Sequence, residues 1–328
     1  MKNASFSVIV PVFNVKDYID EALNSIFAQD YDNFEIIIVD DASTDGSIEK
    51  VEEYIARIND KRIKFIKCET NRGLSTVREE GLKFAKNEWI LFLDSDDWYN
   101  NGLFKKLNEV IQNNPDINII EFTLERVYEN MRRERAAYYD RGVSGIRKSA
   151  EENIMMGTIL CNKCFKRSFL KELNLTPIPR EVLDDVPFSM CAFLCSEYFY
   201  WLNFVGYGYR QRSFSLSGDK SMYPRFIRAV SFLENEIKRL KIYDKTRFQT
   251  ITACMLGWYL SKYDDSLEYK NFYNECRKIF RSFDLKKDVK MPITYNRKLY
   301  RRVRLYPYRL FKLRLKISKF LRRLRGKR

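Results

Sequence analysis

The 328-residue sequence contains no histidine. Its absence excludes a Ser-His-Asp triad, a His-ligated zinc site and an imidazole proton shuttle. Any general base must therefore be supplied by Asp, Glu, Lys, Tyr or Cys.

The sequence also lacks the segments that would send a chain across or into a membrane. No stretch approaches the ~18 uninterrupted apolar residues of a spanning helix. The N-terminal run 5–11 is too short and too β-branched for the apolar core of a secretion signal. The seven cysteines are odd in number and scattered, which is typical of free thiols in a reducing compartment. We therefore expect a cytoplasmic protein.

One cysteine pair, Cys161 and Cys164, has the CxxC spacing. There is no second pair and no histidine to complete a metal site. We interpret both residues as buried structural thiols, in preference to a redox or zinc role, because free cysteine is often buried.

Acidic residues are absent from the last 32 positions, and this absence explains the net charge of +15. Residues 297–328 hold 15 of the 59 Lys and Arg, so the preceding 44 basic residues balance the 44 acidic ones. The chain is thus a neutral body with a basic tail, which implies an anionic surface as its partner.

The tail has the pattern of a basic amphipathic helix. Six of its apolar residues fall within one arc of about 100° on a helical wheel, with Lys and Arg over most of the remainder and Phe311 and Leu315 interrupting the basic side. The residues of this arc are Leu310, Leu313, Ile317, Phe320, Leu321 and Leu324. We favour attachment to an anionic membrane surface. Packing on the protein body is an alternative, and nucleic-acid binding is disfavoured because the neutral body offers no long basic track.

Apolar, β-branched runs alternate with helical patterns over the first third of the chain. We predict strands over 6–13, 34–39, 62–67, 89–93 and 117–122, with helices over 14–27, 47–58, 74–86 and 101–113 between them. This alternation is typical of an α/β fold with a mostly parallel sheet flanked by helices. Further on, 124–150 resembles a loop insertion or hairpin, 151–212 is mixed, and helical patterns cover 222–240, 246–262 and 267–283.

An acidic cluster follows the fourth predicted strand, at the carboxyl edge where such sheets bind ligands. Asp94 and Asp96 can converge on one hard divalent ion such as Mg²⁺ or Mn²⁺, which keeps positions open for phosphate. A departing diphosphate needs this neutralisation. The alternative is that Asp96 or Asp97 only caps the helix 101–113.

A second cluster, which includes Asp40 and Asp41, follows the second strand. A carboxylate there can accept a hydrogen bond from a base imide or a ribose hydroxyl. The alternative is that Asp45 or Ser43 caps the helix 47–58.

Pro11 and Phe13 end the first strand and offer backbone groups and an aromatic face to a nucleobase. Strand termination with a helix cap at Asn14 is the alternative. Far downstream, Asp184 and Asp185 form a candidate general base, since crowded carboxylates raise one another's pKa. The alternative there is a cap on the helix 185–195.

Several segments together resemble the family 2 inverting glycosyltransferases of the GT-A fold in both order and spacing. They are SVIVPVFN (7–14), FEIIIVDDASTDGS (34–47), NRGLSTVREEGLKFAKNEWILFLDSDDW (71–98), CNKCFKRSFL (161–170), LDDVPFSM (183–190) and YRQRSFSLSG (209–218). The resemblance implies a Rossmann-like catalytic domain over 1–220, with a nucleotide-sugar half over 1–115 and an acceptor half over 116–220. A helical region over 221–296 and the tail 297–328 would follow.

The resemblance also implies residue roles. The nucleoside pocket would be lined by Pro11, Phe13 and Asp41, with Asp40 beside them. Arg78 would support the phosphates, although Glu79 replaces the usual Asn after it. The metal-diphosphate motif would be Asp94, Ser95 and Asp96, with Asp96 the direct ligand and Asp97 able to share the role. Asp185 would be the catalytic base, with Asp184 in place of the usual Glu.

The implied function is metal-dependent, inverting transfer of a sugar from a nucleotide-sugar, expected to be a UDP-sugar, to a glycan or lipid-linked acceptor. The setting would be bacterial surface polysaccharide synthesis at the inner face of the cell membrane. A sugar-phosphate nucleotidyltransferase is an alternative, but PVFNVKDY after strand one has no glycine for a phosphate loop. A degenerate scaffold is another alternative, and the intact carboxylates at 41, 94, 96 and 185 oppose it.

Overall fold

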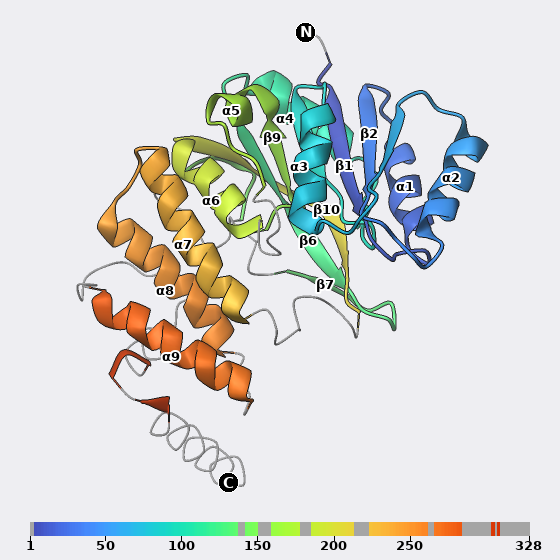
Figure 1. The fold of residues 1–328 in the computed structure, drawn as a ribbon. Helices are drawn as coiled ribbons and strands as arrows, with labels where there is room; N and C mark the ends of the chain where they lie inside the picture. The colour runs from blue at the N-terminus through green and yellow to red at the C-terminus, as the bar shows by residue number, and fades with distance from the viewer. Residues whose placement is uncertain are drawn as a thin grey trace, which may run out of the picture. The chain divides into compact units, whose positions relative to one another are not determined.

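The computed structural model describes residues 3–136, 142–149, 159–177, 185–212, 223–261, 266–283, 303–305 and 307–308 (Figure 1). The chain divides into two compact units, Met1–Ser215 and Leu216–Arg328. The division falls a few residues before the end of the expected catalytic domain at 220, within the stretch 213–222 that lies outside the described residues.

The first unit is built on a sheet with a parallel half. β1 (Phe6–Val12) pairs in parallel with β2 (Phe34–Asp40) and β4 (Trp89–Phe92), and β2 pairs with β3 (Ile63–Lys67). The strand order is β3-β2-β1-β4-β9-β6-β10-β5. The predicted α/β fold with a mostly parallel sheet is therefore confirmed.

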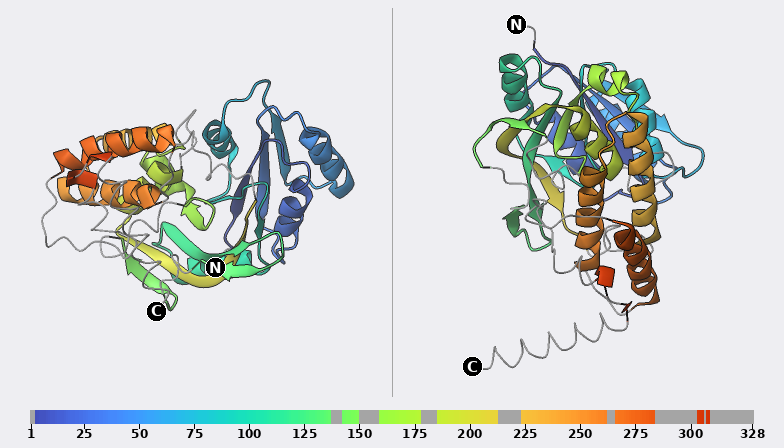
Figure 2. Two further views of the ribbon diagram at one scale, coloured as in Figure 1. Left: turned by 90° about the horizontal axis from the view of Figure 1, so that it is seen from below. Right: turned by 90° about the vertical axis from the view of Figure 1, so that its left-hand side faces the viewer.

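Helices cover both faces of the parallel strands, as Figures 1 and 2 show. On one face, Phe6, Val8 and Val10 join one buried cluster with residues of α1 (Ile19–Phe27), α2 (Ser47–Ile58) and α4 (Leu103–Asn113). On the other face, Ile9 meets α3 (Leu74–Phe84) so closely that a Cβ on Gly81 would come within 2.5 Å of it. Burial on both faces explains why these strands are continuous apolar runs.

The remaining strands form the other half of the sheet. β9 (Lys163–Lys166) is antiparallel to both β4 and β6 (Ile119–Val127), and β10 (Tyr198–Arg210) runs parallel to β6. β5 (Trp98–Tyr99) pairs with the far end of β10. Two helices complete the unit, α5 (Arg167–Glu172) and α6 (Asp185–Cys195).

The region 124–150 contains a hairpin, one of the two predicted alternatives. β6 extends to Val127 and pairs with β7 (Arg133–Arg135). β8 (Gly145–Lys148) pairs with β10. Nearby, Cys161 and Cys164 are free and buried, as predicted.

The second unit is helical. α7 (Tyr223–Arg239), α8 (Lys245–Ser261) and α9 (Leu267–Ser282) confirm the three predicted helices. Tyr223 stacks on Phe272 at 4.9 Å, and Tyr308 packs edge-on against Tyr273 at 5.4 Å. The start of the basic tail is thus partly buried in this unit, whereas its amphipathic part from 309 onward lies outside the described residues. Within the described part of the chain, no helix is long and apolar enough to cross a membrane.

Candidate active site

The predicted site residues gather at one edge of the sheet because β1, β2 and β4 run in parallel. Val12 at the end of β1 lies in register with Asp40, and the Asp41 N–H donates to the Val12 carbonyl at 2.9 Å. The Leu93 N–H donates to the Ile9 carbonyl at 3.0 Å, so the segment after β4 leaves the sheet beside β1.

Asp41 fastens a second loop to this edge. Its side chain is 2% exposed, and its two oxygens accept from the N–H groups of Arg72 at 2.6 Å and Gly73 at 2.8 Å. Gly73 has a φ of +88°, a conformation that favours glycine, and α3 begins at the next residue. A carboxylate has about four lone-pair positions, so Asp41 retains capacity to accept a base imide.

Asp40 is also buried, and its carboxylate bonds to a residue of the same turn. Its carboxylate accepts from the backbone N–H of Ser43 at 2.9 Å and from the Ser43 hydroxyl at 2.5 Å. Asp40 therefore shapes the turn that carries Asp41.

The segment after β1 is fixed against the same turn. Pro11 is buried within β1, whereas Phe13 is 47% exposed. Asn14 has a φ of 51°, donates its N–H to Ser43 Oγ at 3.0 Å, and accepts from the Thr44 N–H at 2.8 Å. Phe13 is thus held with an open aromatic face at the edge of the sheet, next to the loop that carries Asp41.

The N-cap of α2 is Gly46 and no side chain caps this helix, so the capping alternative is wrong for Asp45. Its carboxylate accepts from the N–H of Ser47, the first residue of α2, at 2.9 Å, and from the Lys16 N–H at 3.1 Å. Partial burial works against ionisation, but the hydrogen bonds outweigh it and lower the pKa of Asp45.

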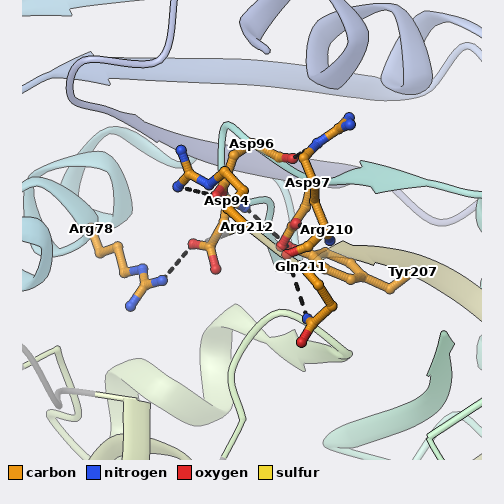
Figure 3. A network of polar contacts seen from close by, with 8 residues as sticks. All are labelled: Arg78, Asp94, Asp96, Asp97, Tyr207, Arg210, Gln211 and Arg212. Carbon is orange, nitrogen blue, oxygen red and sulfur yellow. Dashed lines mark hydrogen bonds and ion pairs between the residues drawn. The ribbon is translucent and has the colours of Figure 1, made fainter. Parts of the chain in front are cut away.

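The loop after β4 carries the carboxylates at 94, 96 and 97 (Figure 3). Asp94 pairs with Arg78, a nearly buried residue of α3, at 2.5 Å. Asp96 pairs with Arg212, and its carbonyl accepts from Arg210 Nε at 2.8 Å. Ser95, between them, is buried. The carboxylates of Asp94 and Asp96 are partly exposed, so both can reach a ligand.

Asp97 differs from its neighbours in its burial and its hydrogen bonds. It is 1% exposed, and it accepts from the Tyr207 hydroxyl at 2.7 Å and the Arg210 N–H at 2.8 Å. Burial, and then the charges of Asp96 and Asp94, raise its pKa well above the ordinary 3.8. Asp97 therefore fastens the loop to β10, through Tyr207 and Arg210. The capping alternative is also wrong here, because α4 begins at Leu103 with Gly102 as its N-cap and no side-chain cap.

Two arginines of this network were not predicted as site residues. Arg210 ends β10, and Arg212 lies two residues beyond it. Both guanidinium groups lie over the ring of Tyr18, at 5.1 and 5.0 Å, and Arg210 also pairs with Glu21. In the sequence they belong to YRQR, the start of the segment 209–218 that resembles the family. That resemblance does not by itself distinguish either arginine as a site residue.

Asp185 is the first residue of α6. Its carboxylate accepts from the Val186 N–H at 3.0 Å, which agrees with the capping alternative but leaves the proposed base role open. Three residues on, the ring of Phe188 packs on Phe92, the last residue of β4, at 6.1 Å. α6 therefore starts near the strand that carries the acidic loop. Asp184 lies outside the described residues.

The carboxylate oxygens of Asp94 and Asp96 are suitable ligands for a hard divalent ion. Burial and the charge of Asp94 raise the pKa of Asp96, while Arg212 and Arg210 lower it. Among the described residues there is no cluster of three or more metal-ligating side chains. Two carboxylates are nevertheless sufficient where substrate phosphate and water complete the ligand shell, as Mg²⁺ prefers.

Comparison with known proteins shows the family to which this chain belongs. The sequence profile of Glycosyl transferase family 2 matches residues 7–173, just over half of the chain. The chain belongs to this family.

Two relatives illustrate the match in sequence. An uncharacterized glycosyltransferase of Haemophilus influenzae is 43% identical over 108 residues, which are 33% of this chain and 42% of that protein. The poly(ribitol-phosphate) beta-N-acetylglucosaminyltransferase TarS of Staphylococcus aureus is 44% identical over 103 residues, which are 30% of this chain and 18% of that protein. The matched part thus spans less than half of either relative.

The fold likeness covers more of the chain. The structure of TarS 1–349 in complex with UDP-GlcNAc has a TM-score of 0.70 and 24% identity over 84% of this chain and 81% of that one. The mannosyltransferase PcManGT of Pyrobaculum calidifontis, in complex with GDP-Man and Mn²⁺, has a TM-score of 0.54 and 16% identity over 87% and 77%. At these identities the likeness shows the GT-A fold alone.

Proposed function

We propose that this chain is a metal-dependent inverting glycosyltransferase that moves a sugar from a nucleotide-sugar to a glycan or lipid-linked acceptor during synthesis of a bacterial surface polysaccharide. One observation carries the proposal. Asp94 and Asp96 stand at the carboxyl end of β4, each beside an arginine, in a chain of a family that transfers sugars. Carboxylates with adjacent guanidinium groups are suited to a cation and a diphosphate together.

The donor half of the site would use three features. The exposed ring of Phe13 offers a stacking face for the base, and Asp41 offers an acceptor for its imide. Arg78, which already contacts Asp94, would support the phosphates. The UDP-GlcNAc in the related TarS structure supports a UDP-sugar as donor.

Asp94 and Asp96 would hold a Mg²⁺ or Mn²⁺ ion, with Asp96 the direct ligand. The ion would supply positive charge against the leaving diphosphate. The GDP-Man and Mn²⁺ in the structure of PcManGT support this assignment.

Asp185 would be the base of a single displacement. Its carboxylate removes the proton of an acceptor hydroxyl as that oxygen attacks the anomeric carbon opposite the nucleotide. The bond from the anomeric carbon to the diphosphate breaks in the same step, so the anomer is inverted. The absence of histidine is compatible with this chemistry, because a carboxylate takes the proton.

The tail 297–328 would hold the enzyme at the cytoplasmic face of the membrane, near a lipid-linked acceptor. Its 15 Lys and Arg with no acid support an anionic lipid surface as partner, and the neutral body supports no role for nucleic acid. The name of TarS, a poly(ribitol-phosphate) beta-N-acetylglucosaminyltransferase, supports a polymer as the acceptor.

A donor panel tests the proposal. Release of nucleoside diphosphate from UDP-, GDP- and dTDP-sugars is measured with EDTA and after Mn²⁺ or Mg²⁺ is returned. We expect release from one donor class, loss with EDTA, and recovery with metal. Asp96→Asn should lose release, whereas Asp116→Asn, at an exposed position, should keep it. Full activity in EDTA would reject the metal role, and no binding or release with any donor would reject the proposal.

A further inference from the structure

Four of the charged side chains around the acidic loop form two ion pairs. Asp94 pairs with Arg78 at 2.5 Å, and Asp96 pairs with Arg212. Figure 3 shows the two guanidinium groups approaching the loop from different elements. Two negative and two positive charges therefore balance before any ligand arrives.

The net charge of these groups is no longer zero if only the divalent ion or only the diphosphate binds. A divalent ion alone would place two positive charges beside two arginines, in a partly buried site where repulsion is screened less than in water. A diphosphate alone would place negative charge beside two carboxylates. Only the ion and the diphosphate together leave the site neutral.

The two arginines differ in how firmly they are held. Arg78 lies within α3, and its side chain is 5% exposed. Arg212 lies beyond the end of β10, its side chain is 30% exposed, and it rests on the ring of Tyr18 at 5.0 Å. Arg210 is fixed by its bonds to the Asp96 carbonyl and to Glu21. Of these three arginines, Arg212 is therefore the one whose side chain can move with the smallest loss of contacts.

We propose that Arg212 occupies the ligand position of Asp96 and competes with the divalent ion for it, so that the ion binds tightly only with the donor diphosphate. Arg212 must leave Asp96 before that carboxylate can ligate, and a diphosphate offers it a replacement partner. This inference rests on the proposed function and adds an order to it: metal affinity is low until the nucleotide is present.

The test measures Mn²⁺ binding directly, by the electron paramagnetic resonance signal of the free ion, with and without UDP, GDP or dTDP. We expect the wild-type protein to bind Mn²⁺ weakly alone and at least about tenfold more tightly with one nucleotide, a usual size for coupling between two ligands. In the absence of nucleotide, Arg212→Gln should bind Mn²⁺ about tenfold more tightly than wild type. The factor by which a nucleotide raises the Mn²⁺ affinity should be at least about tenfold smaller in this variant than in wild type.

Two variants complete the experiment. Arg212→Lys keeps the charge and should behave as wild type, which separates competition from a general loss of folding. Arg57→Gln removes one positive charge at an exposed position of α2, where Arg57 lies over the ring of Tyr54, and should also behave as wild type. If Arg212→Gln binds Mn²⁺ alone no more tightly than wild type, the competition is refuted while the proposed function stands. If wild type binds no Mn²⁺ with any nucleotide, the metal part of the proposed function fails, and this inference fails with it.

Discussion

The ring of Phe188 packs edge-on against the ring of Phe92, with centroids 6.1 Å apart and planes at 80°. Phe92 is the last residue of β4, two positions before Asp94, and Phe188 is in the first turn of α6, which begins at Asp185. One aromatic contact thus connects the element that carries the acidic loop to the element that carries the proposed base.

Phe188→Leu should therefore lower kcat more than it changes the donor KM, because the base would shift relative to a donor that still binds. Phe193→Leu is the matched control, since Phe193 packs on Phe199 at 4.9 Å later in the same helix. Both variants should lose about 1 kcal/mol of unfolding free energy. Equal losses of kcat in the two variants would show that the Phe92 contact has no special positioning role.

A second prediction concerns Gly208, where β10 passes β5. A Cβ at this position would lie 2.1 Å from the indole of Trp98, which directly follows Asp97. Gly208→Ala should cost about 1–3 kcal/mol of unfolding free energy through overpacking, and it should reduce activity by displacing the loop.

Two further variants test this reason. Adding Trp98→Phe to Gly208→Ala should recover part of both losses, because the smaller ring makes room. Gly257→Ala in α8, where a Cβ meets nothing within 4 Å, should stabilise the helix by up to about 1 kcal/mol. A Gly208→Ala enzyme with wild-type stability would contradict the close packing.

A third prediction follows from the raised pKa of Asp97. Burial, then the charges of Asp96 and Asp94, hold this pKa well above 3.8 in the folded chain. Above its unfolded pKa the carboxyl ionises in the unfolded chain while the folded chain keeps its proton, so rising pH weakens the fold until the folded pKa is passed.

Urea unfolding between about pH 4 and 8 measures this effect. Asp97→Asn should show a smaller fall in unfolding free energy with rising pH than wild type. Some fall should persist, because the pKa of Asp96 is raised as well. Asp116→Asn, at an exposed position, should keep the wild-type dependence. An unchanged slope in Asp97→Asn would show that the Asp97 carboxyl is not the group that weakens the fold.

A fourth prediction addresses the tail. Deleting residues 309–328 should abolish sedimentation with vesicles that contain anionic lipid, since each Lys or Arg near such a surface contributes roughly 1 kcal/mol. The melting temperature should change little, because Val303 and Tyr308, which are buried in the helical unit, remain. Equal binding of the full chain to neutral vesicles, or no binding at all, would reject the electrostatic attachment.

The fold was predictable from the sequence where local pattern and tertiary structure agree. FEIIIV is recognisable as a strand because both faces of β2 are covered, and the carboxylates at 41, 94 and 96 were found because strand ends share one edge of a parallel sheet. The helix predicted from Asn14 starts only at Ile19, since the chain first turns with the Tyr18 N–H bonded to the Val15 carbonyl.

Other elements depend on partners distant in the sequence. β10 contains Gly206 and Gly208, shifts register twice against β6, and was missed as a strand. β5 has only two residues and exists through its pairing with β10. Arg210 and Arg212 come to the acidic loop by this same pairing, so no spacing near position 94 could have indicated them.

The assignment of Asp185 as base is tested most directly by comparing Asp185→Asn with wild type for both binding and turnover. We predict that the variant binds the donor nucleotide within about twofold of wild type by calorimetry, yet forms no detectable glycosylated acceptor, a loss of at least about 10² to 10⁴ in kcat. Substantial transfer by Asp185→Asn would contradict it, and so would a loss of transfer explained wholly by lost nucleotide binding.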